Sequence, residues 1–346
     1  MENRNIIVIG ASAGGFEAIK QLINDLPADL DAAIFIVWHM SPDVRGILPH
    51  VINKMGRLKA SHAIDKEKFI NRHVYVAPPD HHLLIEDDRV RVTRGPKENR
   101  FRPAIDPLFR SAAFSYASRV IGVILSGALD DGVAGLWAIK QQGGLAVVQD
   151  PLDAEVSSMP ANAINAVRVN HIVPIKDMGA LLTKLVQEQA PAPTSGENID
   201  HERTVMEVRL AMNEKLSKKE IFEYGELTPY TCPECHGVLT ALREGDRIRF
   251  RCHTGHAFSA DSLLAGITGY VEETLWNTLR SVQESILLLN HMGDHFAEAN
   301  QPKVAAMYFK KAADAARLAD VIRQATFNHE QLNTDNIRDQ ANEQPN

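Results

Sequence analysis

The sequence Ile6-Ile7-Val8-Ile9-Gly10-Ala11-Ser12-Ala13-Gly14-Gly15 lies close to the beginning of the chain. Its first four residues are apolar and β-branched, which predicts a buried strand. Residues 10–14 match G-x-S-x-G, a pattern in which a sharp strand-to-helix turn lifts a serine hydroxyl above the carboxyl end of a sheet. A helix predicted from Phe16 to Leu26 would place its N-terminus beside this serine, where it favours developing negative charge.

The same glycines allow two other interpretations. The stretch can be an ordinary glycine-rich turn without chemistry, or a dinucleotide site related to G-x-G-x-x-G. In the second case Ser12 replaces the middle glycine, which lets the backbone approach a pyrophosphate. The next predicted strand also ends in Trp38-His39, where a dinucleotide site needs an acidic residue for the ribose. Both features disfavour a cofactor.

Further apolar runs continue the strand and helix alternation. They lie at residues 33–37, 120–125, 145–148 and 171–173. Runs without polar interruption are typical of parallel strands covered on both faces, so we expect an α/β fold with a doubly wound, mostly parallel sheet. His73–Val76 and Arg89–Thr93 flank a polar Asp87-Asp88, which predicts a hairpin insertion between residues 73 and 94.

Two more polar residues follow predicted strands. His39 comes directly after the strand at 33–37, and Asp131 follows the strand at 120–125. Because parallel strands end at one edge of a sheet, Ser12, His39 and Asp131 are predicted to meet there as a catalytic triad. Taken alone, the histidine could be a surface or core residue, and the aspartates could cap the next helix. For Asp130 we prefer the cap.

Four segments resemble, in order and spacing, the catalytic domain of the CheB-type protein-glutamate methylesterases of chemotaxis: GASAGG at 10–15, WHMSP at 38–42, RPAIDPLFRS at 102–111 and LSGALDDG at 125–132. The resemblance covers residues 1–186. It implies that Ser12 is the nucleophile, His39 the general base and acid, and Asp131 the orienting carboxylate. It also implies an oxyanion hole formed by the backbone N–H groups of Ala13 and Ala128, and no cofactor for catalysis.

The activity that the resemblance implies is hydrolysis of glutamate methyl esters, and of glutamine amides, on a methyl-accepting receptor or a similar helical signalling protein. The alternative is an adaptor in a sensory complex with weak or no esterase activity. Two departures stand out. Leu129 replaces a glycine of the usual pattern, which we expect to shift the loop that carries Ala128. Ser12 also lies so early that we expect a stand-alone form without a receiver domain.

The second half of the chain changes in character. Residues 187–202 have the composition of a flexible linker, which we expect to tether a C-terminal module without a fixed orientation. That module, at 203–330, includes two stretches with helical periodicity at 264–289 and 304–322, which predict a helical hairpin. The polar residues 331–346 are predicted to be a disordered tail.

A group of cysteines and histidines precedes these helices. Two residues separate Cys232 from Cys235, and sixteen residues separate Cys235 from Cys252. His256 lies four positions after Cys252. This spacing predicts a zinc-ribbon-like structural site with four protein ligands, and the segment resembles an extension of stand-alone members of the family. His253 is the poorer fourth ligand because it adjoins Cys252. The alternative is a chance cluster of reduced thiols.

The overall composition excludes several classes of protein. A formal net charge of −7 at pH 7 disfavours a nucleic-acid surface. No apolar run approaches the ~20 residues of a membrane span and no signal peptide is evident, so we expect a cytoplasmic protein without membrane insertion. Three clustered cysteines fit a reducing compartment and a metal. The sequence leaves the oligomeric state open.

Overall fold

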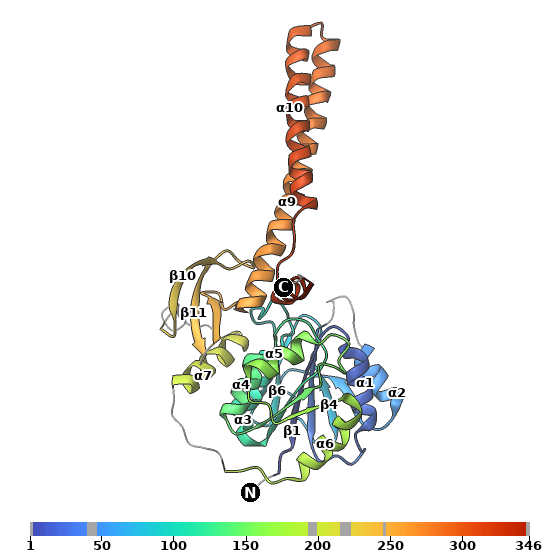
Figure 1. The fold of residues 1–346 in the computed structure, drawn as a ribbon, viewed down its shortest axis with the longest axis vertical. Coiled ribbons are helices and arrows are strands. Elements are labelled where there is room, and N and C mark those ends of the chain that lie inside the picture. Colours follow the sequence, from blue (N-terminus) through green and yellow to red (C-terminus); the bar gives the residue numbers. More distant parts are fainter. Residues whose placement is uncertain (1–2, 40–46, 193–198, 215–222, 245–246, 344–346) are drawn as a thin grey trace. The chain divides into compact units, whose positions relative to one another are not determined.

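The computed structural model describes residues 3–39, 47–192, 199–214, 223–244 and 247–343 (Figure 1). It divides the chain into two compact units, Met1–Leu263 and Leu264–Asn346. The first unit holds the predicted α/β sheet together with a hairpin and a small antiparallel sheet. The second unit is helical.

A parallel sheet forms the centre of the first unit. Its order is β3-β4-β2-β1-β7-β8-β9, and every neighbouring pair is parallel. The strands are β1 (Ile6–Ala11), β2 (Ala33–Trp38), β3 (Lys59–His62), β4 (His73–Val76), β7 (Val120–Ile124), β8 (Leu145–Gln149) and β9 (His171–Val173). The predicted α/β class with a mostly parallel sheet is confirmed, and β1 lies between β2 and β7.

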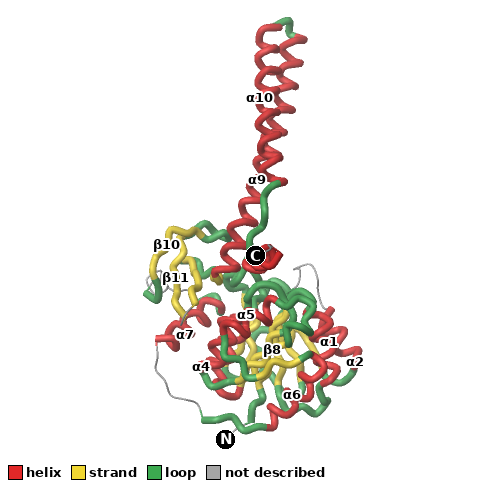
Figure 2. The backbone as a smooth tube through the Cα atoms, viewed as in Figure 1, coloured by secondary structure: helices red, strands yellow, loops and turns green. Residues whose placement is uncertain are grey.

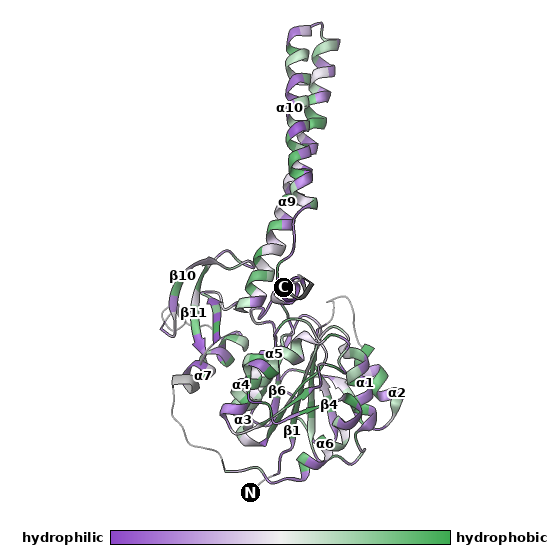
Figure 3. Ribbon diagram, in the orientation of Figure 1, coloured by the Kyte–Doolittle hydropathy of each residue, from purple (hydrophilic) through white to green (hydrophobic). Residues whose placement is uncertain are grey.

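Both faces of this sheet are covered by helices (Figure 2). Alternate residues of β1 enter two separate cores, with Ile6 and Val8 in one and Ile7 and Ile9 in the other. The first core is closed by α3 (Ile105–Tyr116), α4 (Val133–Gln141) and α5 (Ser158–Ala166), and the second by α1 (Gly15–Asp25), α2 (Ile47–Met55) and α6 (Ile175–Gln187). The central strands β1, β2 and β7 accordingly consist of apolar residues, whereas polar and apolar residues alternate along the helices (Figure 3).

One arm of the hairpin is the predicted strand Arg89–Thr93, and the other arm differs from the prediction. Its arms are β5 (His82–Glu86) and β6 (Arg89–Thr93), which pair antiparallel. His73–Val76, predicted as one arm, is instead β4 of the parallel sheet. The reason is burial on both faces: Val74 and Val76 enter one core, and Tyr75 stacks on Phe35 in the other with ring centroids 5.4 Å apart.

The small antiparallel sheet carries the cysteines. Its order is β10-β11-β12-β13, with strands β10 (Glu226–Thr231), β11 (Val238–Glu244), β12 (Arg247–Cys252) and β13 (Ala257–Ser259). Helix α7 (Ile199–Ala211) precedes it and packs on the hairpin, where Thr93 donates a hydrogen bond to the Ala211 carbonyl at 2.5 Å.

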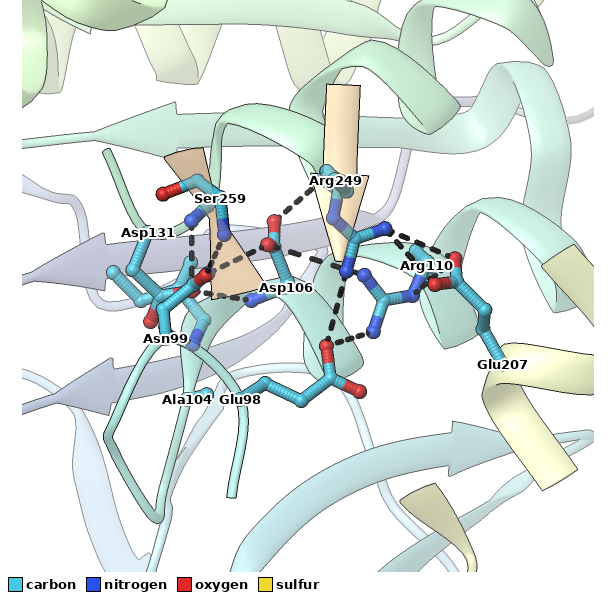
Figure 4. A network of polar contacts seen from close by, with 12 residues as sticks. Glu98, Asn99, Ala104, Asp106, Arg110, Asp131, Glu207, Arg249 and Ser259 are labelled. Carbon is cyan, nitrogen blue, oxygen red and sulfur yellow. Dashed lines mark hydrogen bonds and ion pairs between the residues drawn. The ribbon is translucent and has the colours of Figure 1, made fainter. Parts of the chain in front are cut away.

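A buried ionic network joins this sheet to the α/β part (Figure 4). Arg251 of β12 contacts Glu207 of α7 at 2.7 Å and Glu98 of the α/β part at 3.3 Å. Arg249 contacts the same Glu207 at 2.9 Å, and Arg110 of α3 pairs with Glu98. All five side chains are at most 5% exposed. Charges so deeply buried are tolerated only in fixed, paired geometry.

This docking corrects the expectation of a loose tether. The composition of residues 187–202 predicts a module without fixed orientation, but the sheet that carries the cysteines belongs to the same compact unit as the α/β part. Residues 193–198 of the predicted linker lie outside the described residues. The orientation is set beyond the linker, by the buried charges of α7 and β12.

The second unit contains the predicted helical hairpin. Helix α9 (Ala260–Glu298) enters it at Leu264 and is followed by α10 (Pro302–Phe327). Three alanines seven residues apart, Ala305, Ala312 and Ala319, form the buried seam of α10. Where a disordered tail is predicted, the structure has α11 (Thr334–Glu343), whose first turn is capped by the Asn333 side chain at 2.8 Å from the Asn336 amide nitrogen. No helix in the described ranges is long and apolar enough to cross a membrane.

Substitution Glu207→Gln tests the network. It leaves the guanidinium groups of Arg110, Arg249 and Arg251 with one carboxylate fewer, and is expected to lower the free energy of unfolding by about 3–5 kcal/mol. Urea denaturation of the full chain measures this. Glu214→Gln is the matched control, because its ion pair with Arg209 is about half exposed and contributes less than about 1 kcal/mol. Equal effects of the two substitutions would contradict the docking.

Candidate active site

Ser12 lies in the turn between β1 and α1. Its amide donates to the Ser126 carbonyl at 3.0 Å, and the Trp38 indole donates to the Ser12 carbonyl at 3.2 Å. Gly14 begins the helix with φ +69°, and a Cβ there would lie 2.7 Å from Ser126 Oγ. The turn therefore needs glycine at this position, and neighbouring strand ends hold the serine in place.

His39 connects Ser12 to Asp131. Its Nδ1 lies 3.2 Å from Ser12 Oγ, and its Nε2 lies 2.8 Å from Asp131 Oδ2. Because a carboxylate only accepts, the ring proton belongs on Nε2, which leaves Nδ1 free to accept the serine proton. Phe101 stacks on the imidazole with centroids 3.8 Å apart and planes 10° apart. The structure thus brings together the three residues that the sequence predicts.

Asp131 is satisfied by several donors in addition to His39. The Ile105 amide donates at 2.7 Å, Asn99 Nδ2 at 2.9 Å and the Gly132 amide at 3.0 Å. Burial opposes its ionisation, but the hydrogen bond and charge of His39 and the surrounding N–H groups hold the pKa of Asp131 below its ordinary value. The carboxylate is therefore charged and able to stabilise an imidazolium.

The two predicted oxyanion donors flank the serine. Ala13 follows Ser12 directly, and Ala128 follows Gly127, whose Cα packs so closely on Ser12 that a Cβ there would lie 2.8 Å from Ser12 Cβ. Within the described ranges, neither the Ala13 nor the Ala128 amide has a hydrogen-bond partner. Their role as oxyanion donors therefore stays a prediction. Residues 40–46, which include Met40 to Pro42 of the second motif, lie outside the described residues.

A family model described as CheB methylesterase matches residues 7–182, half of the chain. The chain belongs to the CheB methylesterase family. It is 42% identical over 186 residues to a protein of Leptospira interrogans serogroup Icterohaemorrhagiae assigned as a protein-glutamate methylesterase/protein-glutamine glutaminase, covering 54% of this chain and 96% of that one. A Photorhabdus laumondii protein-glutamate methylesterase/protein-glutamine glutaminase is 35% identical over 195 residues, 55% of each chain.

A solved structure agrees with this assignment. The crystal structure of the Thermotoga maritima CheB methylesterase catalytic domain superposes with a TM-score of 0.51 at 31% identity, covering 54% of this chain and 100% of that one. The CheB match ends before the sheet that carries the cysteines.

Leu129, which we expect to shift the loop that carries Ala128, follows Ala128 directly in the chain. It has φ +62°, the left-handed conformation that glycine would adopt most easily. Its carbonyl accepts a hydrogen bond from Asn162 Nδ2 at 3.0 Å, and the Gly127 carbonyl accepts from the Met159 amide at 2.8 Å. The loop therefore takes a glycine-like conformation with leucine in it, held by α5.

Asp130 does not cap the next helix, so that interpretation is wrong. Gly132 occupies the cap position of α4 with φ +91°, and the side chain that bonds the first turn is Asp106, whose Oδ1 accepts from the Gly135 amide at 2.6 Å. Asp130 instead accepts from Ser259 Oγ at 2.7 Å. Burial, opposed by this hydrogen bond, raises the pKa of Asp130 to about 7. Burial and the neighbouring Asp131 also raise the pKa of Asp106, to about 6.

The Cys/His residues form a second cluster in the same unit. The ligand atoms of Cys232, Cys235, Cys252 and His256 all lie within 4.8 Å of one another, and this group could hold a metal ion. Cys235 Sγ and Cys252 Sγ are 3.7 Å apart, close to the edge of about 3.8 Å that follows from zinc–sulfur bonds of about 2.3 Å in a tetrahedron. Hydrogen bonds from Cys232, His256 and Thr254 hold the pKa of Cys252 far below its ordinary value.

Two residues beside the triad are not predicted by any sequence pattern. Asn99 and Phe101 stand in an irregular loop before α3 and contact Asp131 and His39. Neither has a periodic or spaced signal. The one available hint is local: Asn99 has φ +48°, and asparagine is among the few residues that tolerate this conformation.

Two substitutions of Leu129 test the loop. Leu129→Gly is expected to keep kcat on a small activated ester within about twofold, because glycine adopts the same φ without strain. Leu129→Val is expected to lower kcat on the order of tenfold or more, because a β-branched residue disfavours positive φ and would displace Ala128. Steady-state kinetics measures kcat of both variants. A lower kcat in Leu129→Gly but not in Leu129→Val would contradict this role of the backbone at Leu129.

Proposed function

We propose that this chain hydrolyses the methyl ester of glutamate side chains in a protein substrate, and the corresponding amide of glutamine. The observation that carries the proposal is the continuous line of hydrogen bonds from Ser12 through His39 to Asp131, at 3.2 Å and 2.8 Å. Membership of the CheB family and the names of its relatives support the same reaction.

The proposed reaction proceeds by acyl transfer. Ser12 Oγ attacks the ester carbonyl carbon while His39 Nδ1 takes its proton, and Asp131 stabilises the resulting imidazolium. The Ala13 and Ala128 amides donate to the oxyanion. His39 then protonates the departing methanol, or ammonia from an amide. Water repeats the cycle on the acyl-enzyme and releases the glutamate side chain.

The substrate we propose is a methyl-accepting chemoreceptor or a similar helical signalling protein. Membership of the CheB family, which acts on chemoreceptors, supports this substrate. An adaptor role with weak hydrolysis is the second candidate. It is supported by apolar residues exposed on the helical hairpin, where Leu287 is 70% and Leu288 62% exposed.

For the Cys/His cluster we propose one structural zinc ion. The donor set supports zinc, since three thiolates and an imidazole are the ligands it prefers in tetrahedral sites. Four protein ligands would leave no position for water or substrate, so the ion would stabilise β10–β13 and take no part in the hydrolysis.

Substitutions at adjacent aspartates test the triad. Asp131→Asn is expected to lower kcat on the order of 10⁴-fold, and Ser12→Ala on the order of 10⁶-fold. Because the two residues act as one unit, the double variant should have a kcat no lower than that of Ser12→Ala alone. Asp130→Asn is the matched control, because its carboxyl group faces Ser259 and not His39, and it should keep most of kcat. Release of methanol from a methylated receptor measures all of these. Turnover by Ser12→Ala near that of the wild type would reject the mechanism and favour the adaptor.

Adjacent histidines test the zinc site. His256→Ala is expected to abolish stoichiometric zinc, whereas His253→Ala should retain it, because His253 lies against Gly237 and outside the group of four. Elemental analysis of purified protein reads the metal content, with one zinc per chain expected for the wild type. A wild-type protein without bound metal, or equal loss from both variants, would count against the site.

A further inference from the structure

Asn99 lies between the triad and the Cys/His sheet. Its side chain is buried, at 2% exposure, and belongs to the loop before α3. Its Nδ2 donates to Asp131 Oδ1 at 2.9 Å and to Asp106 Oδ2 at 3.0 Å. On the other side, its Oδ1 accepts from the Ser259 amide at 3.0 Å and from Ser262 Oγ at 3.1 Å (Figure 4). These four hydrogen bonds use the full capacity of a side-chain amide.

The orientation of this amide is determined by its partners. The carboxylates of Asp131 and Asp106 accept hydrogen bonds, so the NH₂ group of Asn99 must lie on their side. On the opposite side the Ser259 amide donates, so the Asn99 oxygen lies there. The donors to Oδ1 come from β13 and from the first turn of α9. The Ser259 amide, which can only donate, therefore supports the orientation in which Asn99 presents its NH₂ group to Asp131.

The backbone around Asn99 is fixed by the same segment. The Asn99 amide donates to the Ala257 carbonyl at 2.8 Å, and the Ala257 amide donates to the Lys97 carbonyl at 3.2 Å. Glu98, between them, is held by Arg249 and Arg251 of β12. Residues 97–99 thus form backbone hydrogen bonds with β13, the edge strand of the sheet that carries the cysteines.

We propose that Asn99 is a positioning residue of the triad, and that residues 249–262 complete the active site by holding it. This rests on the proposed function. Asn99 binds Asp131 Oδ1 while Oδ2 of the same carboxylate binds His39. Together with the Ile105 and Gly132 amides, the Asn99 side chain restricts the rotation of the carboxylate and through it the imidazole. The part of the chain beyond the CheB match then affects catalysis through Asn99 and Asp131, without contacting the substrate.

The effect of Asn99 should appear in kcat and not in KM. A side chain with 2% exposure does not touch substrate, and its loss misplaces a catalytic group. Asn99→Ala is expected to lower kcat on the order of 10²-fold. Ser262→Ala removes a single donor to Asn99 from outside the α/β part and should lower kcat about three- to tenfold, with KM unchanged.

The experiment is a kinetic cycle in the full chain on a small activated ester. Ser262→Ala and Asn99→Ala are each measured in the wild type and in Asp131→Asn. Because both residues act through Asp131, their effects on kcat should vanish in the Asp131→Asn background. Ser285→Ala is the matched control, since that serine is exposed on α9 and its hydroxyl donates to the Ser281 carbonyl of the same helix, and it should leave kcat unchanged.

Unchanged kcat in Ser262→Ala, or undiminished losses in the Asp131→Asn background, would overturn the positioning role. A second readout is independent of turnover: the His39 ring N–H proton in ¹H NMR of histidine-¹⁵N-labelled protein. Its signal should move or broaden in Ser262→Ala and not in Ser285→Ala, and an unmoved signal overturns the proposal. Absence of any Ser12-dependent hydrolysis in the wild type would instead reject the proposed function, and the NMR comparison would still decide the role of Asn99. If Asn99→Ala does not fold, Ser262→Ala carries the test.

Discussion

A charged carboxylate buried at the carboxyl edge of a parallel sheet must be surrounded by donors, and Asp131 meets this requirement from several parts of the chain. Its side chain is 2% exposed, so every hydrogen bond it lacks would cost free energy. The backbone at the start of α3 supplies one donor, His39 another, and Asn99 a third. The geometry of the nucleophile is therefore linked to residues more than a hundred positions away in the sequence.

The second constraint is the group of buried charges that joins the sheet carrying the cysteines to the α/β part. Glu98 and Arg110 come from one side and Glu207, Arg249 and Arg251 from the other. Such a network contributes little net stability, but it disfavours other arrangements of the two parts, because these would leave buried charges unpaired. Its position next to Asn99 explains why a segment outside the catalytic fold can reach the triad.

The sequence was sufficient for five of the seven strands of the sheet and for the residues that meet at its edge. Uninterrupted apolar runs indicated strands buried on both faces, and the carboxyl ends of such strands bring Ser12, His39 and Asp131 together. It was insufficient where tertiary pairing decides. His73–Val76 has the composition of either a hairpin arm or a sheet strand, and only its packing on Phe35 makes it β4. The linker composition describes the linker alone, so it could not reveal the docking through Arg249 and Arg251. No sequence pattern indicates Asn99, because its role depends on four hydrogen-bond partners that lie in other segments of the chain.

The central claim is that Ser12 removes methyl groups from glutamate side chains with the help of His39 and Asp131. Mass spectrometry of a methylated chemoreceptor fragment, incubated with the full chain and with Ser12→Ala in parallel, tests it most directly. We expect loss of methyl groups from glutamate side chains with the wild-type chain and full retention with Ser12→Ala. Retention with both proteins, or equal loss with both, would contradict it.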